Sequence, residues 1–192
     1  MGLPKGLIEV GGKPWILVQL EALQRAGQGI GISRVHVVLG HQREAYEKIL
    51  RPHSSGLEIV TVLNPDPDRG PFSSLQCGLQ RALEAADFGG AWVLPVDVPC
   101  PARSVWESLE HEAGVRAADA ALPVHHGKGG HPVRLSVRFV ETLLSISPAA
   151  PDARLDHQIH ALPASRVARV EVEDERVLAN LNTPSDFSRL AV

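Results

Sequence analysis

Hydrophobic and polar positions follow two alternating periods along this 192-residue chain. Short apolar runs bounded by turn residues predict strands at residues 35–39, 57–63, 91–96, 120–124, 166–172 and 177–181. Apolar residues on one face predict helices at residues 14–26, 41–50, 73–86, 104–111, 136–146 and 183–190. Strands that alternate with helices indicate βαβ units with right-handed crossovers. We therefore expect a three-layer α/β fold with a mostly parallel sheet, in one domain spanning residues 1–192.

A single carboxylate follows one of the most apolar of these runs. The predicted strand at residues 91–96 leads directly into Asp97, and Val98 and a proline come next. Ligands of open α/β sheets bind beyond the carboxyl ends of the strands, and Mg²⁺ prefers one or two carboxylates there together with substrate phosphates. Asp97 is therefore a candidate magnesium ligand. The alternative is an aspartate that caps the turn after the strand.

The amino-acid composition limits which kinds of molecule the protein is expected to bind. The chain is 44% hydrophobic and 21% charged, with a formal net charge of −3, which is ordinary for a globular protein and gives no global positive field. We expect no nucleic-acid partner, and no apolar run approaches the ~20 residues needed to span a membrane. Cys77 and Cys100 lack metal or redox spacing, so we interpret them as reduced packing residues of a cytoplasmic protein.

The first residues predict a loop where nucleotide-binding domains usually have a buried strand. Such domains begin with a strand and a Gly-rich turn whose amides hold phosphate. Here the chain opens with Met1-Gly-Leu-Pro-Lys5, so Lys5 is left as a candidate phosphate-binding charge. The alternative for Lys5 is an exposed lysine near a terminus.

Five motifs in a fixed order resemble the molybdenum-cofactor nucleotidyltransferases and their GT-A-type relatives. They are Met1-Gly-Leu-Pro-Lys5 with the following Gly-Gly-Lys-Pro14, the loop Asn64–Gly78, Leu94-Pro-Val-Asp97-Val-Pro, Gly129-Gly-His131-Pro-Val, and Asn180-Leu-Asn182-Thr-Pro-Ser-Asp186. Each motif is weak alone, but together they cover nearly the whole chain. The resemblance implies a Rossmann-like, GT-A-type fold. It also implies Mg²⁺-dependent transfer of a nucleoside monophosphate from GTP or CTP to a small phosphorylated acceptor, with molybdopterin as the first candidate.

The resemblance also implies roles for individual residues. Lys5 and Asp97 would be catalytic, with Lys5 on the phosphates and Asp97 on the metal. Asn180 or Asn182, which alternate along a predicted strand end, would complete the metal site, whereas Asn182 or Thr183 could instead cap the last helix. The residues implied to hold the nucleotide are Lys5, Asn64, Gly70, Ser73 and Ser74, and the two serines could instead cap a helix. The residues that could contact an anionic acceptor, or lie at a solvated surface, are His131, Arg134 and Arg154.

The chain departs from the family at its start. The family places a strand and a Leu-Ala-(Gly or Ala)-Gly-x-Ser-x-Arg stretch before Met-Gly-x-Pro-Lys, and this sequence begins at that methionine. We expect that it was read from an internal methionine or trimmed. We also expect a gap in the sheet beside Lys5, or a substitute that covers the gap.

The identity of the nucleotide base stays open at the level of sequence. The Asn180 and Asp97 motifs favour a guanylyltransferase, whereas the Gly70-Pro-Phe-Ser73-Ser74-Leu and His131 motifs favour a cytidylyltransferase. Two further alternatives remain. One is a nucleotidyltransferase that acts on a sugar phosphate or an alcohol phosphate. The other is a nucleotide-binding protein without catalysis.

Overall fold

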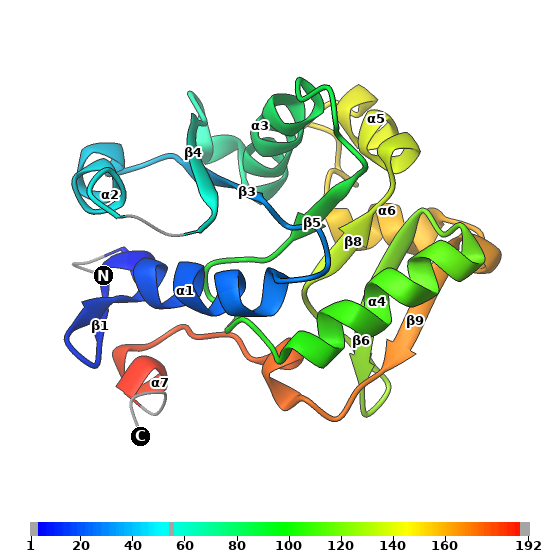
Figure 1. Ribbon diagram of the computed structural model, residues 1–192. Coiled ribbons are helices and arrows are strands. Elements are labelled where there is room, and N and C mark those ends of the chain that lie inside the picture. Colours follow the sequence, from blue (N-terminus) through cyan, green and yellow to red (C-terminus); the bar gives the residue numbers. More distant parts are fainter. Residues whose placement is uncertain (1–3, 54–55, 189–192) are drawn as a thin grey trace.

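The computed structural model describes residues 4–53 and 56–188. Figure 1 shows the arrangement of the elements along the chain. The helices are α1 (Trp15–Gly27), α2 (Arg43–Leu50), α3 (Pro71–Leu83), α4 (Arg103–Arg116), α5 (Val137–Ser145), α6 (Leu155–Ala161) and α7 (Pro184–Ser188). The strands are β1 (Glu9–Val10), β2 (Lys13–Pro14), β3 (Arg34–Leu39), β4 (Glu58–Leu63), β5 (Ala91–Val93), β6 (Ala120–His125), β7 (Lys128–Gly129), β8 (Val133–Leu135) and β9 (Val167–Glu171). Short 3₁₀ helices occupy Lys5–Leu7, Pro67–Arg69, Ala164–Arg166 and Glu175–Leu178.

The two longest strand pairings are parallel. Strand β3 pairs with β4 from Arg34↔Glu58 to Leu39↔Leu63, and β6 pairs with β9. Strand β8 is antiparallel and lies between β5 and β6, while β7 forms a hairpin on β6. These pairings confirm an α/β fold with a mixed, mostly parallel central sheet.

The side chains of β6 alternate between two cores. Ala120 and Leu122 pack into a cluster with residues of α3, α5 and α6. Ala121 packs on the other face, with residues of α4 and β9. The sheet is therefore covered on both faces, with α4 on one side and α5 and α6 on the other (Figure 1), which gives the expected three layers.

Several element boundaries differ from the sequence-based prediction. The strand predicted at residues 91–96 ends at Val93, because Pro95 has no N–H to donate and β8 pairs with β5 only from Ala91 to Val93. The strand predicted at 177–181 is wrong. Its first residues form the 3₁₀ helix Glu175–Leu178, and its backbone makes isolated hydrogen bonds instead of a ladder. The last predicted helix is observed as Pro184–Ser188, and residues 189–190 lie outside the described part of the chain.

The expected gap in the sheet is present. Within the described residues, β3 pairs with β4 alone and β5 pairs with β8 alone. Residues of both strands line one cleft with a volume of about 1500 Å³. We call it the β3–β5 cleft. The described residues form no helix long and apolar enough to cross a membrane.

Candidate functional site

Three polar side chains from distant parts of the chain meet at one nitrogen atom. The Nζ atom of Lys5 donates to Oδ2 of Asp97 at 2.7 Å and to Oδ1 of Asn182 at 2.8 Å. The Lys5 and Asp97 side chains are 26% and 24% exposed, so the ion pair is reachable from solvent and borders the β3–β5 cleft through Asp97. The structure thus brings together three of the residues expected at the site.

Helix α1 holds the turn that carries Asp97. The indole Nε1 of Trp15 donates to the carbonyl of Val96 at 2.6 Å, and Nε2 of Gln19 donates to the carbonyl of Val98 at 2.6 Å. The Gln19 amide oxygen also accepts from the backbone N–H of Cys100 at 2.9 Å. Asp97 therefore lies in a turn fixed on both sides, four residues beyond the end of β5. The sequence analysis did not identify Gln19 as a support of this turn. A glutamine among the apolar residues of the predicted helix was the feature that could have indicated it.

A backbone hydrogen bond brings the closing motif to the same turn. The N–H of Leu181 donates to the carbonyl of Asp97 at 2.8 Å, and this places Asn182 beside the carboxylate. Asn180 is exposed, and its backbone carbonyl accepts from Nδ2 of Asn182 at 3.3 Å. Of the two asparagines, Asn182 is therefore the one whose amide oxygen lies beside the Lys5–Asp97 ion pair.

The start of α7 is stabilised by a carboxylate and not by Asn182. Oδ2 of Asp186 accepts from the N–H groups of Asn182 at 3.0 Å and Thr183 at 2.8 Å. Phe187 packs edge-on against the Trp15 ring, with 5.6 Å between centroids. Asn182 and Thr183, the two residues expected to cap this helix, therefore donate their backbone N–H groups to Asp186. The amide oxygen of Asn182 accepts from Lys5.

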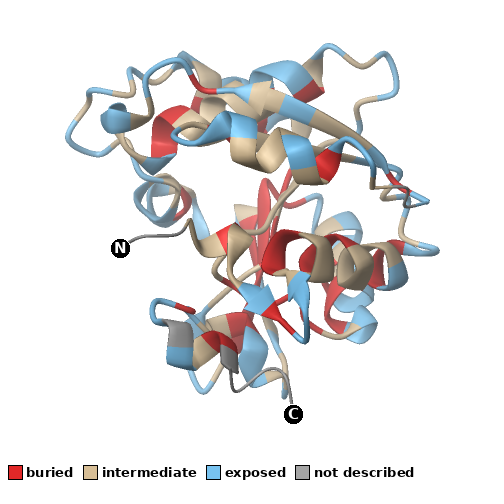
Figure 2. Ribbon diagram, turned by 90° about the vertical axis from the view of Figure 1, so that its left-hand side faces the viewer, coloured by how far each residue is buried: buried red, intermediate tan, exposed pale blue. Residues whose placement is uncertain are grey.

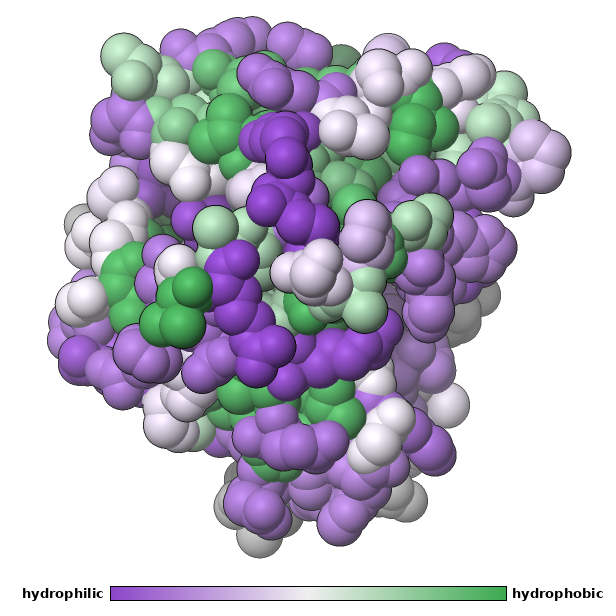
Figure 3. Space-filling model, turned by 90° about the vertical axis from the view of Figure 1, so that its right-hand side faces the viewer, coloured by the Kyte–Doolittle hydropathy of each residue, from purple (hydrophilic) through white to green (hydrophobic). Residues whose placement is uncertain are grey.

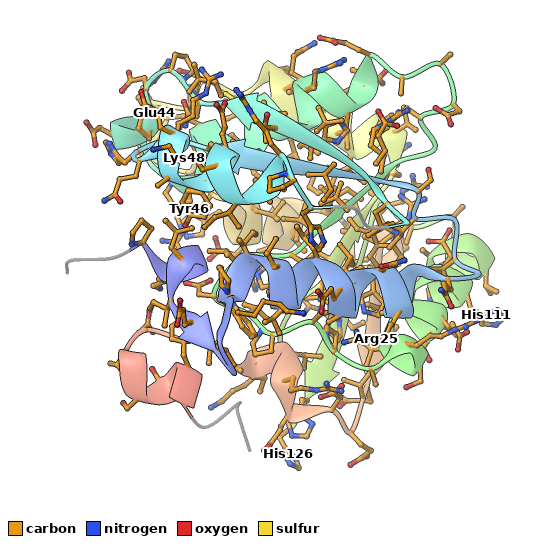
Figure 4. All side chains as sticks on the ribbon, turned by 60° about the vertical axis from the view of Figure 1, so that its left-hand side comes forward. Arg25, Glu44, Tyr46, Lys48, His111 and His126 are labelled. Atoms are coloured by element: carbon orange, nitrogen blue, oxygen red, sulfur yellow. The ribbon has the colours of Figure 1, made fainter. Side chains whose placement is uncertain are left out.

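The loop that carries Lys5 is held by α2. The backbone N–H of Gly6 donates to the hydroxyl of Tyr46 at 3.2 Å. Tyr46 points from α2 toward the amino-terminal segment (Figure 4). A Cβ added at Gly6 would lie 2.8 Å from the Tyr46 ring and hydroxyl, so glycine allows this close approach. Burial raises the pKa of Tyr46, and the hydrogen bond from Gly6 opposes that shift, so the phenol is neutral near pH 7.

The residues expected to hold the nucleotide form a second group around Asn64. Nδ2 of the buried Asn64 donates to the hydroxyls of Ser73 and Ser74, both at 2.9 Å. Ser73 donates in turn to the carbonyl of Gly70 at 2.8 Å, and Gly70 has the positive φ of +91° that favours glycine. These contacts fix the loop that leads into the amino end of α3. Ser74 and Asp97 both line the β3–β5 cleft, so the two groups face one cavity.

The residues expected on the acceptor side, His131, Arg134 and Arg154, all line the β3–β5 cleft. His131 lines the cleft, and burial lowers its pKa while the Asp97 carboxylate opposes the shift. Its Nδ1 lies 3.4 Å from the carbonyl oxygen of Val93. The guanidinium of Arg134 is bound to Glu110 at 2.9 Å and lies over the Trp92 ring. Exposed Arg154 pairs with Asp156 at 3.0 Å.

The donor set at the site suits a hard cation. Asp97 Oδ2 and Asn182 Oδ1 converge on a single positive group, the Lys5 ammonium. Carboxylate and amide oxygens are the ligands that Mg²⁺ and similar ions prefer, usually with waters and substrate phosphates completing the shell. Among the described residues, no cluster of three or more His, Cys, Asp or Glu side chains could hold a metal. The oxygen pair would therefore hold a cation together with a substrate, not alone.

Comparison with known proteins gives a consistent result. Residues 1–167 match the family described as the MobA-like NTP transferase domain. The chain is 24% identical to the molybdenum cofactor cytidylyltransferase of Escherichia coli over 159 residues, which cover 81% of this chain and 72% of that protein. It is 38% identical to the CMP-5'-(3-aminopropyl)phosphonate synthase of Streptomyces rubellomurinus over 64 residues, which cover 33% of this chain but only 10% of that protein.

The fold is also found among solved structures. The structure of Rv0371C from Mycobacterium tuberculosis in complex with manganese aligns with a TM-score of 0.70 at 18% identity. The alignment covers 99% of this chain and 92% of that one. At this identity the likeness concerns the fold.

Proposed function

Because the chain belongs to the MobA-like NTP transferase domain family, we propose that it transfers a cytidylyl group from CTP to a small phosphorylated acceptor. The observation that carries the proposal is the convergence of Lys5, Asp97 and Asn182 on one point at the edge of the cleft. Such a transfer needs positioning and charge neutralisation more than covalent catalysis. An ammonium group beside a carboxylate and an amide oxygen provides both requirements.

The reaction forms one bond and breaks another at the α-phosphorus. An oxygen of the acceptor attacks the α-phosphorus of CTP, and the bond to the oxygen that bridges to the β-phosphate breaks. Pyrophosphate leaves with that bridging oxygen. Lys5 supports this exchange by pairing its ammonium group with the phosphate charge. His131, whose pKa is lowered by burial, faces the same cleft and is placed to orient the acceptor.

A divalent cation fits the oxygen pair of Asp97 and Asn182. When bound, the cation would neutralise charge on the phosphates of the nucleotide. Manganese is present in the complex of the structurally similar Rv0371C, which supports a divalent ion at this kind of fold. We propose Mg²⁺ as the ion in this protein, because a site with few protein ligands that is completed by substrate phosphates is typical of magnesium.

CTP is favoured over GTP by the activities of relatives that the chain matches in sequence. The Escherichia coli protein is a cytidylyltransferase, and the Streptomyces protein is a synthase of a CMP derivative. The first relative favours molybdopterin as the acceptor. The second favours a small phosphonate, a related acceptor that the 38% identity over 64 residues makes worth testing.

A panel of nucleotides tests the proposal. The chain would be incubated with CTP, GTP, ATP or UTP, with Mg²⁺, and with molybdopterin or 3-aminopropylphosphonate, and pyrophosphate release would be measured. We expect release with CTP that depends on the acceptor and is abolished by EDTA. Release with GTP alone would overturn the choice of base. Binding of CTP without release in any acceptor arm would favour a nucleotide-binding protein without catalysis.

A further inference from the structure

Lys5 donates to oxygen atoms of two separate parts of the chain. Oδ2 of Asp97 and Oδ1 of Asn182 accept from its Nζ atom at 2.7 and 2.8 Å, and the two residues lie 92 and 177 positions away in sequence. Lys13, by contrast, donates twice to the single carboxylate of Glu21, at 2.7 and 3.0 Å. The ammonium of Lys5 therefore occupies a point at which a carboxylate oxygen and an amide oxygen converge.

Several other ion pairs of the molecule are local. On α4, Arg103 pairs with Glu107, and Arg116 pairs with Glu112. Each of these pairs joins residues four positions apart, and hydrophilic residues cover much of the outer surface, as on the face in Figure 3. Exposed pairs of this kind contribute little to stability. The group around Lys5 differs, because it joins the amino-terminal segment to the two segments that carry the oxygens.

The two oxygens are positioned independently of Lys5. Asp97 lies in the turn that α1 holds by hydrogen bonds on both sides of it. Asn182 is brought to this turn by the backbone hydrogen bond from Leu181 to the Asp97 carbonyl at 2.8 Å. The amide Nδ2 of Asn182 donates to the carbonyl of Asn180 at 3.3 Å, which leaves Oδ1 as the atom that faces Lys5. Both oxygens would therefore keep their positions if the ammonium moved away.

Lys5 is the partner that can move. Its side chain is 26% exposed. Pro4 and Lys5, the first described residues, lie at the surface of the molecule with intermediate burial (Figure 2). A lysine ammonium sits on a flexible four-carbon stem, so it can exchange one partner for another. Movement of this side chain alone would release the oxygen pair, with no change in the backbone.

A divalent cation on the same oxygens would compete with Lys5. Mg²⁺ lies about 2.1 Å from its oxygen ligands, so a cation bound to Oδ2 of Asp97 would lie within about 5 Å of an ammonium that the same oxygen holds at 2.7 Å. Like charges at this distance repel, and both would share the single negative charge of Asp97. The oxygen pair therefore favours one cation at a time.

We propose that Lys5 is the cation that holds the Asp97 and Asn182 oxygens before substrate binds, and that a divalent cation binds there only as Lys5 leaves. The phosphates of the nucleotide give the ammonium an alternative partner, so the nucleotide and the divalent cation enter the site together. The inference rests on the cation site of the proposed function and assigns Lys5 a positioning role in the free protein. Its consequence is that the free protein binds a divalent cation alone only weakly.

Binding of Mn²⁺ alone tests the proposal. Free Mn²⁺ would be measured by electron paramagnetic resonance as the ion is titrated into the 192-residue chain and its variants, without nucleotide. Lys5→Met removes the ammonium and keeps an apolar side chain, whereas Lys5→Arg keeps the positive charge. Lys13→Met is the matched control, because it removes another lysine that pairs with a carboxylate at 2.7 Å.

We expect Lys5→Met to bind Mn²⁺ at least ~fivefold more tightly than the parent protein, because the competing charge is gone. Lys5→Arg and Lys13→Met should bind Mn²⁺ within about twofold of the parent protein. The gain should disappear when Asp97→Asn is added to Lys5→Met, since the cation then loses its carboxylate ligand. That pattern would locate the competition at the Asp97 and Asn182 oxygens.

A second measurement needs no variant. In the parent protein with ¹⁵N-labelled lysine, the Nζ signal of Lys5 should shift toward that of the exposed Lys48, which Figure 4 labels on α2, as Mg²⁺ is added without nucleotide. The shift is expected because Lys5 loses its two acceptors to the cation and turns to solvent.

Equal binding of Mn²⁺ by the parent and Lys5→Met proteins would overturn the proposal. An equal gain in Lys13→Met, or a gain that survives Asp97→Asn, would also overturn it, because the effect would then come from overall charge or from another site. A Lys5 signal that is unchanged when Mg²⁺ saturates the protein would contradict it as well. None of these measurements uses CTP, so their failure is distinguishable from a failure of the proposed function.

Discussion

Lys5 binds two oxygen-bearing side chains that lie far from it in sequence. Each of these side chains is positioned by a different set of hydrogen bonds. Asp97 is placed by the hydrogen bonds that α1 makes to the carbonyls of Val96 and Val98. Asn182 is placed by the hydrogen bond from Leu181 to the Asp97 carbonyl. The geometry therefore distinguishes Asn182 from Asn180, which the sequence pattern treated as equivalent.

This difference predicts unequal effects of two matched substitutions. Asn182→Ala removes the amide oxygen that faces Lys5 and should lower kcat/KM for transfer by about tenfold, equivalent to ~1.4 kcal/mol. Asn180→Ala should change kcat/KM by less than about twofold, because Asn180 contacts the Asn182 side chain through its backbone carbonyl, which the substitution keeps. Thermal unfolding of both variants should match the parent protein, since Asp186 and not Asn182 caps α7. Equal losses of activity in the two variants would contradict this assignment.

Another residue-scale prediction concerns a buried carboxylate outside the site. Asp119 is 4% exposed and accepts from Arg166 at 2.8 and 2.9 Å, and also from Arg138 and Ser136. The Arg166 hydrogen bonds hold the pKa of Asp119 well below its usual range, and burial opposes them. The carboxylate therefore stabilises the fold above its unfolded pKa of about 4, and this contribution is lost as the pH falls below that value.

Asp119→Asn should accordingly make stability less dependent on pH in the acid range. Urea unfolding between about pH 2 and pH 7 should show a smaller fall in the free energy of unfolding than in the parent protein. At pH 7 the variant should be less stable by about 3–5 kcal/mol, because two arginines lose a buried partner. The matched control is Asp68→Asn, since the Asp68 side chain is 85% exposed. Parallel pH curves for the parent and Asp119→Asn proteins would refute the role.

At the scale of elements, α1 and α2 act as supports for the site. Helix α1 carries Trp15 and Gln19 to the Asp97 turn, and α2 carries Tyr46 to the Lys5 loop. The apolar periodicity predicted the helices themselves and most strands to within a few residues. It could not predict these supports, because a tryptophan N–H and a glutamine amide find their carbonyl partners about 80 residues away only in the folded chain. Local pattern carries no information on contacts of that range.

The contact between Gly6 and Tyr46 predicts strong coupling between two substitutions. Gly6→Ala should lower both activity and melting temperature, because its Cβ would lie 2.8 Å from Tyr46. In a Tyr46→Ala background the same change should cost less, with a coupling energy on the order of 1 kcal/mol. Tyr46→Phe, which keeps the ring but loses the acceptor for the Gly6 N–H, should lower kcat/KM by about two- to tenfold. A double-mutant cycle measured by thermal unfolding and by transfer rate checks these values, and additive losses would contradict direct contact.

At the scale of the whole molecule, the sequence predicted the three-layer α/β fold and the gap in the sheet. Alternation of strands and helices was enough for the layers, because each element must bury its apolar face. The antiparallel strand β8 and the short helix α6 were missed, since segments of three and seven residues are too short to show a period. For the site, the motif order pointed to Lys5, Asp97 and either Asn180 or Asn182, whereas the contacts of Arg134 with Trp92 and Glu110 followed only from the packing of the folded chain.

The central claim is that the group formed by Lys5, Asp97 and Asn182 carries out nucleotidyl transfer. Asp97→Asn tests it most directly, because the substitution removes the charge while an amide oxygen of similar size remains. The measurement is transfer of label from α-³²P-labelled CTP to molybdopterin in the presence of Mg²⁺. Thermal unfolding is the check on folding, and Asp152→Asn, at an exposed carboxylate outside the lining of the cleft, is the control. We predict that Asp97→Asn lowers the transfer rate at least ~100-fold, or about 2.7 kcal/mol. Its melting temperature should stay close to that of the parent protein, because the partly exposed ion pair with Lys5 contributes about 1 kcal/mol at most. Transfer by Asp97→Asn at the rate of the parent protein would contradict the account.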